Sequence, residues 1–541
     1  MAPVSVVVIP ARDEEHVIAA CLTALARQTV GVAAFETILV ADACADQTEA
    51  VARSTAGRLG LALTVLEGPG AGSGPARRLG MDAAAGRLEA LGRPDGLIAT
   101  TDADSTPAED WLARQLAHLA RGAAVVAGLI ELDPDEVLRL PEAVRGRRER
   151  DARRRLSEVA AREPEAEHHH FAGASLGVAV ATYRRVDGLD GCRALEDEAF
   201  GAKLARHGIP VVRAADVRVL TSARTDGRAR RGLSVDLAVS TWREQCRHCA
   251  DTFTPEDLRA AKRATAVSVI LPTKECAGTI TGVLETVIAP AVAAGLVDEA
   301  IVIDAASRDG TARYAAATGA LVVQQDELLP EHGPALGKGD AMWRGLSCSS
   351  GDVVCFLDAD TEDPHPHHLL GLLGPLLLHP ELALVKGAFD RPFRTGRQTL
   401  ANEGGRVTEV MARPLLNLHF PLLAGFAQPL AGEFGARREL LTSIPFPVGY
   451  GVEIAVLIDA LERRGLQALA ECHLGSRQNR HQPLRALGEM AFAVLAAVEQ
   501  RLEGPRSVTG GQYLRPWEDG AVVHVPVDER PPLDSLRAVA A

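Results

Sequence analysis

Two short acidic motifs in this 541-residue chain could bind a metal ion. In FLDADTEDPHP (356–366), an apolar run leads directly into Asp358 and Asp360, and IATTDADS (98–105) places Asp102 and Asp104 in the same way. Residues i and i+2 of an extended segment point to the same side, so each pair of carboxylates is expected to face one site. Mg²⁺ is commonly held by one or two carboxylates together with the phosphates of a substrate. Each pair therefore predicts a divalent cation that tethers a nucleotide diphosphate.

The acidic motif belongs to a longer internal repeat. VSVVVIP (4–10) returns as VSVILP (267–272), and ILVADACADQT (38–48) returns as IVIDAASRDGT (301–311). The acidic motifs follow at nearly the same spacing in both halves. A repeat of this kind predicts two copies of one fold.

Each copy alternates short Val/Ile-rich runs with Ala/Leu-rich segments of helical period, as in HVIAACLTALARQ (16–28). This alternation predicts βαβ units around a parallel sheet. We therefore expect an α/β chain with two Rossmann-like, mostly parallel domains in tandem, over 1–235 and 236–541. The polar stretch REQCRHCADTFTPEDLRAAKRA (243–264) follows the expected boundary, and the Pro-rich C-terminal tail is expected to lie over the surface.

Composition excludes several classes of partner. The net charge of −13 disfavours nucleic acid, because binding to a phosphate backbone needs clustered cations. An uninterrupted apolar run of about 18 residues is absent, which argues against a membrane span, and the N-terminus meets charge at once, unlike a signal peptide. Nine scattered cysteines are typical of reduced thiols, so we expect a cytoplasmic protein. Cys246 and Cys249 lack a second ligand pair, and a zinc site is not predicted there.

Carboxylates also end other predicted strands. Asp13 closes the first strand, and Asp42 and Asp304 close the second strand of each copy. A carboxylate at these places could accept hydrogen bonds from a ribose or from a uracil N–H. For Asp13 and Asp46, a helix N-cap is an equally good interpretation.

The first half resembles the family-2 glycosyltransferases of GT-A fold, through VVIPARDEE, VADACADQT, TTDADS and RALEDE. The resemblance implies that Asp104 binds the metal and that Asp197 is the general base that takes the proton of the acceptor hydroxyl. Glu196 is the neighbouring alternative. The nucleotide-sugar donor would contact Pro10, Ala11, Asp13, Asp42 and Asp102. Arg77 and Arg78 could meet a phosphate or form an exposed pair.

The second half resembles the glucosyl-3-phosphoglycerate synthases over about 254–541. The shared stretches include LGKGDAMWRGL, FLDADTEDPHPHHLLGLLGPLL, LVKGAFDRP, GGRVTEVMARPLL and QPLAGEFGARRELLTSIPFPVGYGVEIAVLID. The resemblance implies a second GT-A domain that transfers glucose from UDP-glucose to 3-phosphoglycerate with retention of configuration, using Mg²⁺ or Mn²⁺. It places the chain in glucosylglycerate biosynthesis.

The same resemblance assigns site residues. Glu453 would accept hydrogen bonds from the sugar hydroxyls, and Arg477 would neutralise the leaving diphosphate. The metal would bind Asp360 and Asn479. The acceptor would bind Gly405, Arg406, Thr408 and His481, because glycine lets the main chain approach and arginine grips an anion. The donor would contact Pro272, Thr273, Lys274, Ala305, Lys338, Asp358, Ala359 and Tyr450.

Two departures from the family pattern leave alternatives open. The family's Asn and Glu of L-P-A-L-N-E-E fall on Glu275 and Cys276, and its metal-ligating His falls on Asn479, with histidine displaced to His481. The donor could therefore be GDP-mannose in place of UDP-glucose, or one half could be a non-catalytic scaffold that binds sugar nucleotides. A nucleotidyltransferase is a further alternative that the GGRVTE stretch disfavours. The oligomeric state stays open, a homo-oligomer included.

Overall fold

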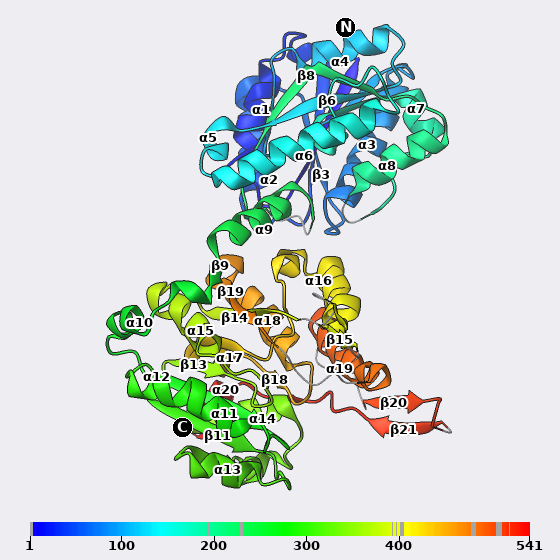
Figure 1. Ribbon diagram of the computed structural model, residues 1–541. Coiled ribbons are helices and arrows are strands. Elements are labelled where there is room, and N and C mark those ends of the chain that lie inside the picture. Colours follow the sequence, from blue (N-terminus) through cyan, green and yellow to red (C-terminus); the bar gives the residue numbers. More distant parts are fainter. Residues whose placement is uncertain are drawn as a thin grey trace. The chain divides into compact units, whose positions relative to one another are not determined.

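The chain divides into two compact units, Met1–Thr241 and Trp242–Ala541. The computed structural model in Figure 1 describes residues 4–192, 195–227, 231–391, 393–395, 398–400, 405–477, 483–504, 511–518 and 520–540. The boundary expected between residues 235 and 236 falls inside a helix, α9 (Leu233–Gln245). Within the described parts of the chain, no helix is long and apolar enough to cross a membrane.

An eight-stranded mixed sheet forms the centre of the first unit. β1 pairs in parallel with β2 and β4, and only β7 runs antiparallel to both of its neighbours, β4 and β6. In spatial order the strands are β3 (Leu63–Glu67), β2 (Phe35–Ala41), β1 (Ser5–Ala11), β4 (Leu97–Thr100), β7 (Leu176–Ala179), β6 (Val125–Leu132), β8 (Val212–Thr221) and β5 (Ser105–Pro107).

Helices bury both faces of this sheet. Every residue of β1 is buried, as expected of a central parallel strand. Val7 and Ile9 pack with α1, α2 and α4, whereas Val6 and Val8 pack with α3, α7 and α8. The helices of this unit are α1 (Ile18–Ala26), α2 (Thr48–Leu59), α3 (Ser73–Ala90), α4 (Trp111–Ala120), α5 (Pro134–Val137), α6 (Glu142–Ala160), α7 (Val180–Arg185), α8 (Glu196–Arg206) and the part of α9 up to Thr241.

The sheet of the second unit repeats this order, with β17 as the antiparallel strand. The strands are β12 (Leu321–Gln324), β11 (Glu299–Asp304), β10 (Val267–Thr273), β13 (Val353–Phe356), β17 (Phe434–Arg437), β14 (Leu384–Asp390), β19 (Leu469–Ser476) and β9 (Arg247–Cys249). The edge strands differ, because β9 is parallel to β19 whereas β5 is antiparallel to β8. The predicted α/β fold with two mostly parallel sheets is confirmed.

The helices of the second unit follow the same plan. They are α10 (Pro255–Lys262), α11 (Ile280–Val283), α12 (Ala289–Ala293), α13 (Thr311–Ala317), α14 (Lys338–Cys348), α15 (His367–Leu378), α16 (Arg413–His419), α17 (Arg438–Ser443), α18 (Val452–Arg464), α19 (Leu484–Glu503) and α20 (Leu533–Ala540). One glycine in each unit explains how closely a helix lies on its sheet. A Cβ on Gly80 of α3 would lie 2.4 Å from Val8 Cγ1, and one on Gly345 of α14 would lie 2.7 Å from Ile270 Cγ2. Only glycine fits at these two crossings.

The polar stretch expected near the boundary is part of the second unit. Residues Arg247–Cys249 form edge strand β9, and the buried Trp242 donates from Nε1 to Leu469 O at 2.6 Å. Thr254 caps α10 by accepting from Asp257 N at 3.2 Å. A polar sequence forms a strand here because an edge strand has one side open to solvent.

The C-terminal tail does not simply lie over the surface. Its strand β22 (Glu529–Arg530) pairs with β18 (Phe446–Pro447), and Trp343 Nε1 donates to Pro531 O at 2.8 Å. The short strands β15 (Phe393–Thr395) with β16 (Gln398–Leu400), and β20 (Gln512–Arg515) with β21 (Ala521–His524), form two separate antiparallel pairs. The tail is fixed in place because the two-residue strand β22 pairs with β18 through backbone groups. Composition alone does not reveal such a pairing.

Candidate active sites

The acidic motif of the second unit lies where the sequence predicted, directly after central strand β13 (Figure 1). Lys338 Nζ contacts Asp358 Oδ1 at 2.7 Å and Glu453 Oε1 at 2.8 Å. Arg477 Nη2 contacts Asp358 Oδ2 at 3.1 Å and Asp360 Oδ1 at 3.2 Å. Four segments far apart in sequence therefore meet: the start of α14, the loop after β13, the first turn of α18 and the residue after β19.

These contacts set the charges of the site. Burial alone would raise the pKa of Asp358, but the charges of Lys338 and Arg477 lower it, so this carboxylate stays ionised. Burial and the charge of Asp358 raise the pKa of Asp360. The Asp360 side chain is 58% exposed, whereas that of Asp358 is 18% exposed. Asp360 is therefore the carboxylate of the pair that a ligand can reach more easily.

Three charged residues of this site were missed in the sequence. Glu433, just before β17, contacts Arg477 Nη1, and its Oε2 is buried without a hydrogen-bond partner in the described structure. Lys386 is fully buried, donates to Ala431 O at 2.5 Å, and has its pKa lowered to about 7 by burial. Burial lowers the pKa of Arg391 to about 10. The available signal was a charge inside an apolar strand, as in VKGAF (385–389).

A small hollow lies beside the acidic motif, lined by residues that include Val283, Val287, Asp358, Thr361, His368 and Glu433. The other predicted donor residues surround the same edge of the sheet. Pro272 and Thr273 end β10, Lys274 follows it, Ala305 follows β11, Ala359 separates the two aspartates, and Tyr450 precedes α18. Donor contact by these residues stays a prediction.

The predicted acceptor residues begin a helical turn. Gly405 has a left-handed φ of 71°, and Arg406 and Thr408 follow it into the turn Thr408–Ala412, where Thr408 is buried. Glycine adopts this φ without strain, so the main chain can bend there. Asn479 and His481 lie outside the described residues.

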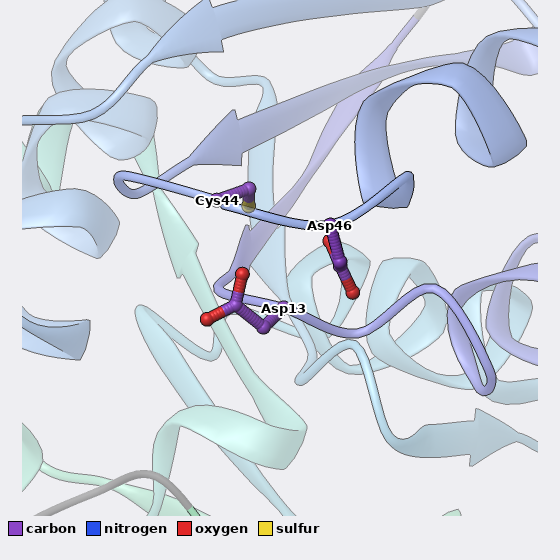
Figure 2. A group of neighbouring side chains, drawn as sticks. All are labelled: Asp13, Cys44 and Asp46. Atoms are coloured by element: carbon purple, nitrogen blue, oxygen red, sulfur yellow. The ribbon is translucent and has the colours of Figure 1, made fainter.

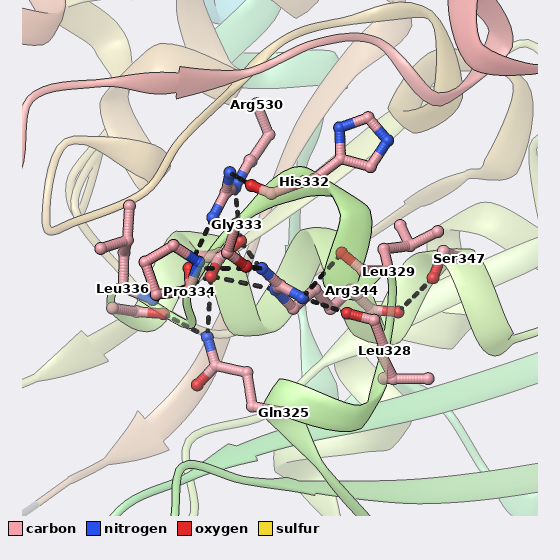
Figure 3. A network of polar contacts seen from close by, with 12 residues as sticks. Gln325, Leu328, Leu329, His332, Gly333, Pro334, Leu336, Arg344, Ser347 and Arg530 are labelled. Atoms are coloured by element: carbon pink, nitrogen blue, oxygen red, sulfur yellow. Dashed lines mark hydrogen bonds and ion pairs between the residues drawn. The ribbon is translucent and has the colours of Figure 1, made fainter.

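The loop before Lys338 is held by a buried ionic network, shown in Figure 3. Asp340 and Arg344 are fully buried, and Asp340 accepts from Arg344 Nε and from Arg530 Nε, the latter at 2.7 Å. Arg344 Nη2 donates to Gly333 O at 2.8 Å, and Arg530 Nη2 donates to Pro334 O at 2.9 Å. The tail thus fixes the backbone that leads into Lys338.

We expect Arg530→Gln to lower the local stability of residues 328–336 by about 2–3 kcal/mol, because it leaves the buried Asp340 with one cation fewer. Amide hydrogen exchange of this segment measures the change. Arg515→Gln is the matched control, since Arg515 of β20 pairs with two partly exposed carboxylates, Glu489 of α19 and Glu518. Equal exchange in the two variants would contradict the bracing role of Arg530.

The loop after β10 departs from the family pattern at Glu275 and Cys276, but it keeps a backbone contact of the equivalent loop in the first unit. Cys276 N donates to Thr311 Oγ1 at 2.8 Å, as Glu14 N donates to Thr48 Oγ1 at 2.7 Å in the first unit. Burial raises the pKa of Cys276 to about 11, so a neutral thiol stands where the first unit has a carboxylate. Glu275 has a left-handed φ of 55°, a conformation that asparagine adopts more readily. The presence of Glu275 and Cys276 therefore changes the chemical groups of this loop more than it changes the backbone conformation.

The acidic motif of the first unit contacts two different arginines. Arg77 Nη2 contacts Asp102 Oδ1 at 2.6 Å, and its Nε contacts Glu196 Oε1 at 3.0 Å. The Arg77 side chain is only 4% exposed, so neither alternative from the sequence, a phosphate ligand or an exposed pair, describes it. It joins the first aspartate of the motif to an acid of α8, as Lys338 joins Asp358 to Glu453. Arg78, by contrast, is partly exposed and faces Asp82 at 3.6 Å.

Asp104 contacts Arg224, which the sequence analysis missed. Arg224 Nη2 lies 2.9 Å from Asp104 Oδ2, and the guanidinium also binds both carboxylate oxygens of Glu14, at 2.8 and 2.6 Å. Burial and the charge of Asp102 raise the pKa of Asp104. Alignment of the two halves at the end of β8 and β19 could have found Arg224, since Arg477 follows β19.

The predicted base of the first unit lies in the first turn of α8. Asp197 accepts from Glu198 N at 2.9 Å and from Gly173 N at 3.4 Å. Burial and the charge of Glu196 raise the pKa of Asp197. A raised pKa strengthens a carboxylate as a proton acceptor, which fits the role predicted for this residue.

The strand-end carboxylates of the first unit hold loops. Asp42 accepts from Gly70 N at 2.6 Å and Gly72 N at 3.0 Å. Figure 2 shows Asp13, Cys44 and Asp46 near one another. Asp13 follows Pro10 and Ala11 at the end of β1, and Cys44 and Asp46 follow β2. Asp46 accepts from Thr48 N, the first residue of α2, but it precedes the N-cap position, which is Gln47, and Asp13 accepts from Ala45 N and joins two loops. Their contacts with a donor stay a prediction.

Comparison with known proteins places this chain. The family description "Glycosyl transferase family 2" matches residues 6–178 and 268–428. The chain belongs to glycosyl transferase family 2. It is 43% identical to the glucosyl-3-phosphoglycerate synthase of Mycolicibacterium smegmatis over 289 residues, which are 53% of this chain and 95% of that protein. The enzyme of Mycobacterium tuberculosis strain H37Rv is 44% identical over 294 residues, 53% of this chain and 90% of that protein.

Solved structures show the same likeness. The M. tuberculosis enzyme in complex with Mn²⁺, UDP-glucose and phosphoglyceric acid is 43% identical, with a TM-score of 0.48, over 53% of this chain and 96% of that chain. Mannosyl-3-phosphoglycerate synthase from Rubrobacter xylanophilus is 43% identical, with a TM-score of 0.50, over 55% of this chain and 99% of that chain.

This family-2 protein is a glycosyltransferase, and its two sheets have the GT-A arrangement. The two matched segments contain both acidic motifs, Asp102 with Asp104 and Asp358 with Asp360. Asp197, Glu453 and Arg477 lie beyond the matched segments. The roles of those three residues therefore stay predictions.

Proposed function

We propose that the second unit transfers glucose from UDP-glucose to the hydroxyl of 3-phosphoglycerate, with retention of anomeric configuration. The convergence of Lys338 and Arg477 on Asp358 carries the proposal, because two cations beside an acidic motif suit a nucleotide diphosphate. The names of the relatives and the motifs of residues 254–541 support it. Asp360 would hold a divalent cation, Mg²⁺ or Mn²⁺.

An exposed carboxylate at the end of a central strand fits such a cation, which prefers oxygen ligands. When bound, the cation neutralises charge on the leaving diphosphate. Arg477 adds a fixed positive charge beside the leaving diphosphate, and Glu453 in α18 accepts hydrogen bonds from hydroxyls of the sugar. The bond from the anomeric carbon to the phosphate oxygen breaks, the acceptor oxygen bonds to that carbon, and its proton passes to the leaving phosphate. Arg406, Gly405 and Thr408 bind the acceptor's anionic groups.

The first unit is proposed to be a second nucleotide-sugar transferase. Asp197 would take the proton of its acceptor, and Asp104 would hold its cation. The raised pKa of Asp197 supports the first role, and the position of Asp104 after β4 supports the second. Its donor sugar and acceptor are not assigned.

GDP-mannose is a second candidate donor for the second unit. The neutral thiol of Cys276 and the strained Glu275 replace the residues expected at the nucleotide loop, and the mannosyl-3-phosphoglycerate synthase relative has a TM-score of 0.50. A changed loop would alter base recognition before it altered the phosphate contacts.

Incubation of the full chain with 3-phosphoglycerate, Mg²⁺ or Mn²⁺ and a panel of nucleotide sugars tests the proposal. We expect glucosyl-3-phosphoglycerate from UDP-glucose, identified by mass and by the α-configuration in NMR spectra. Mannosyl-3-phosphoglycerate from GDP-mannose would establish the second candidate. The absence of a phosphoglycerate glycoside with every donor would contradict both and favour a non-catalytic second unit.

A further inference from the structure

Each unit carries an arginine just after the same strand of its sheet. β8 and β19 both occupy the seventh position in the strand order, next to β6 and β14 respectively. Arg224 follows β8 by a short segment, and Arg477 follows β19 directly. The carboxyl end of a strand in an open α/β sheet is where ligands bind. The two arginines therefore enter equivalent sites from equivalent directions.

Both guanidiniums contact the second aspartate of the acidic motif. Arg224 Nη2 lies 2.9 Å from Asp104 Oδ2, and Arg477 Nη2 lies 3.2 Å from Asp360 Oδ1. Asp104 and Asp360 are the residues proposed to hold the cation in each unit. A diphosphate tethered to that cation would thus lie within reach of the arginine beside it.

The second partner of the arginine differs between the units. Glu14, in the loop after β1, binds Arg224 through both carboxylate oxygens. The repeat places Cys276 at the position of Glu14, and Arg477 contacts Glu433 instead, just before β17. Each arginine is thus oriented by a nearly buried glutamate, with side chains 10% exposed for Glu14 and 2% for Glu433. The glutamate that orients the arginine therefore lies in a different segment in each unit, whereas both arginines contact the second aspartate of the acidic motif.

Arg224 also differs from the other arginine of its site. The Arg77 guanidinium contacts Asp102, Glu196, Thr100 Oγ1 and Gly173 O, and its side chain is 4% exposed. Those contacts fix Arg77 as part of the framework. The Arg224 side chain is 23% exposed, so solvent and ligands can reach it.

We propose that Arg224 binds the diphosphate of the nucleoside diphosphate sugar used by the first unit. This inference rests on the proposed function of that unit. Glu14 orients the guanidinium, and the contact with Asp104 keeps it beside the cation position. Arginine suits this role because its fork of donors matches phosphate oxygens in pairs.

Calorimetric titration of the full chain tests the assignment. Asp360→Ala removes one of the two cation ligands expected in the second unit, so we expect Mn²⁺-dependent nucleotide binding in that background to report on the first unit. UDP, GDP and ADP identify the nucleotide, and the matching nucleoside monophosphate serves as the comparison. We expect Arg224→Gln to weaken diphosphate binding about 10- to 100-fold, since charge-assisted hydrogen bonds are lost. Monophosphate binding should weaken less than about threefold.

Two further variants separate binding from structure. Arg224→Lys keeps the charge and should recover part of the diphosphate affinity. Arg218→Gln is the matched control, because Arg218 lies on β8 and forms an exposed pair with Glu131 at 2.6 Å. It should bind the diphosphate like the parent.

The outcomes distinguish the two levels of inference. Unchanged diphosphate affinity in Arg224→Gln, or an equal loss for diphosphate and monophosphate, would overturn the role of Arg224 alone. If no nucleoside diphosphate binds the first unit even with Arg224 present, the proposed function of that unit fails, and the role of Arg224 fails with it.

Discussion

Asp360→Ala is expected to reduce glucosyl transfer to 3-phosphoglycerate at least about 100-fold. The substitution removes the more exposed carboxylate of the second acidic motif, and charge stabilisation of this kind is commonly worth about 10²–10³ in rate. Initial rates with UDP-glucose at saturating Mg²⁺ or Mn²⁺ measure the effect. Raising the cation concentration should recover part of the activity if the lost carboxylate is a ligand.

Glu362→Ala provides the matched control for this prediction. Glu362 is an exposed carboxylate two residues further along the same loop. Its removal should change the rate less than about twofold, because exposed charges away from the site are screened by solvent. Asp104→Ala assigns the activity to a unit: if it, and not Asp360→Ala, abolishes transfer to 3-phosphoglycerate, the assignment to the second unit is wrong.

Arg477→Gln is expected to impair both stability and activity of the second unit. The Arg477 side chain is 1% exposed and contacts Asp358, Asp360 and Glu433. Removal of one partner from a buried ionic group typically costs about 3–5 kcal/mol, because the remaining charges stay buried without compensation. Urea denaturation of the full chain, followed by circular dichroism, should show the transition of one unit at a lower urea concentration while that of the other is unchanged.

The pH dependence gives this prediction a second test. Arg477 helps to lower the pKa of Asp358 below its ordinary value of 3.8 in the folded protein. A lowered pKa contributes stability above pH about 4, and that contribution is lost as the pH falls through the folded pKa. The difference between the parent and Arg477→Gln should therefore shrink below pH 4. Arg477→Lys, which keeps a charge, should fall between them, and a difference that is independent of pH would contradict the ionic account.

Much of the fold could be predicted because it depends on local patterns. Apolar runs on both faces marked the central strands β1 and β13, and the repeat predicted that their neighbours would have the same order. The tail and the polar stretch before β9 were harder to predict. Each forms a short strand whose existence depends on a partner, β18 or β19, that is remote in the sequence.

The sequence by itself determined that two acidic motifs would follow central strands, and that Lys338, Glu453 and Arg477 belong with the second motif. It did so because strand ends and matched motifs can be recognised from short stretches of consecutive residues. Only the tertiary structure decided which charges neutralise which: Arg77 and Arg224 take one aspartate each in the first unit, whereas Arg477 takes both in the second. Most of these ion pairs, Arg224 with Asp104 and Arg477 with Asp358 and Asp360, join residues more than 100 positions apart, and such pairs form only where folding brings their segments to one edge of a sheet.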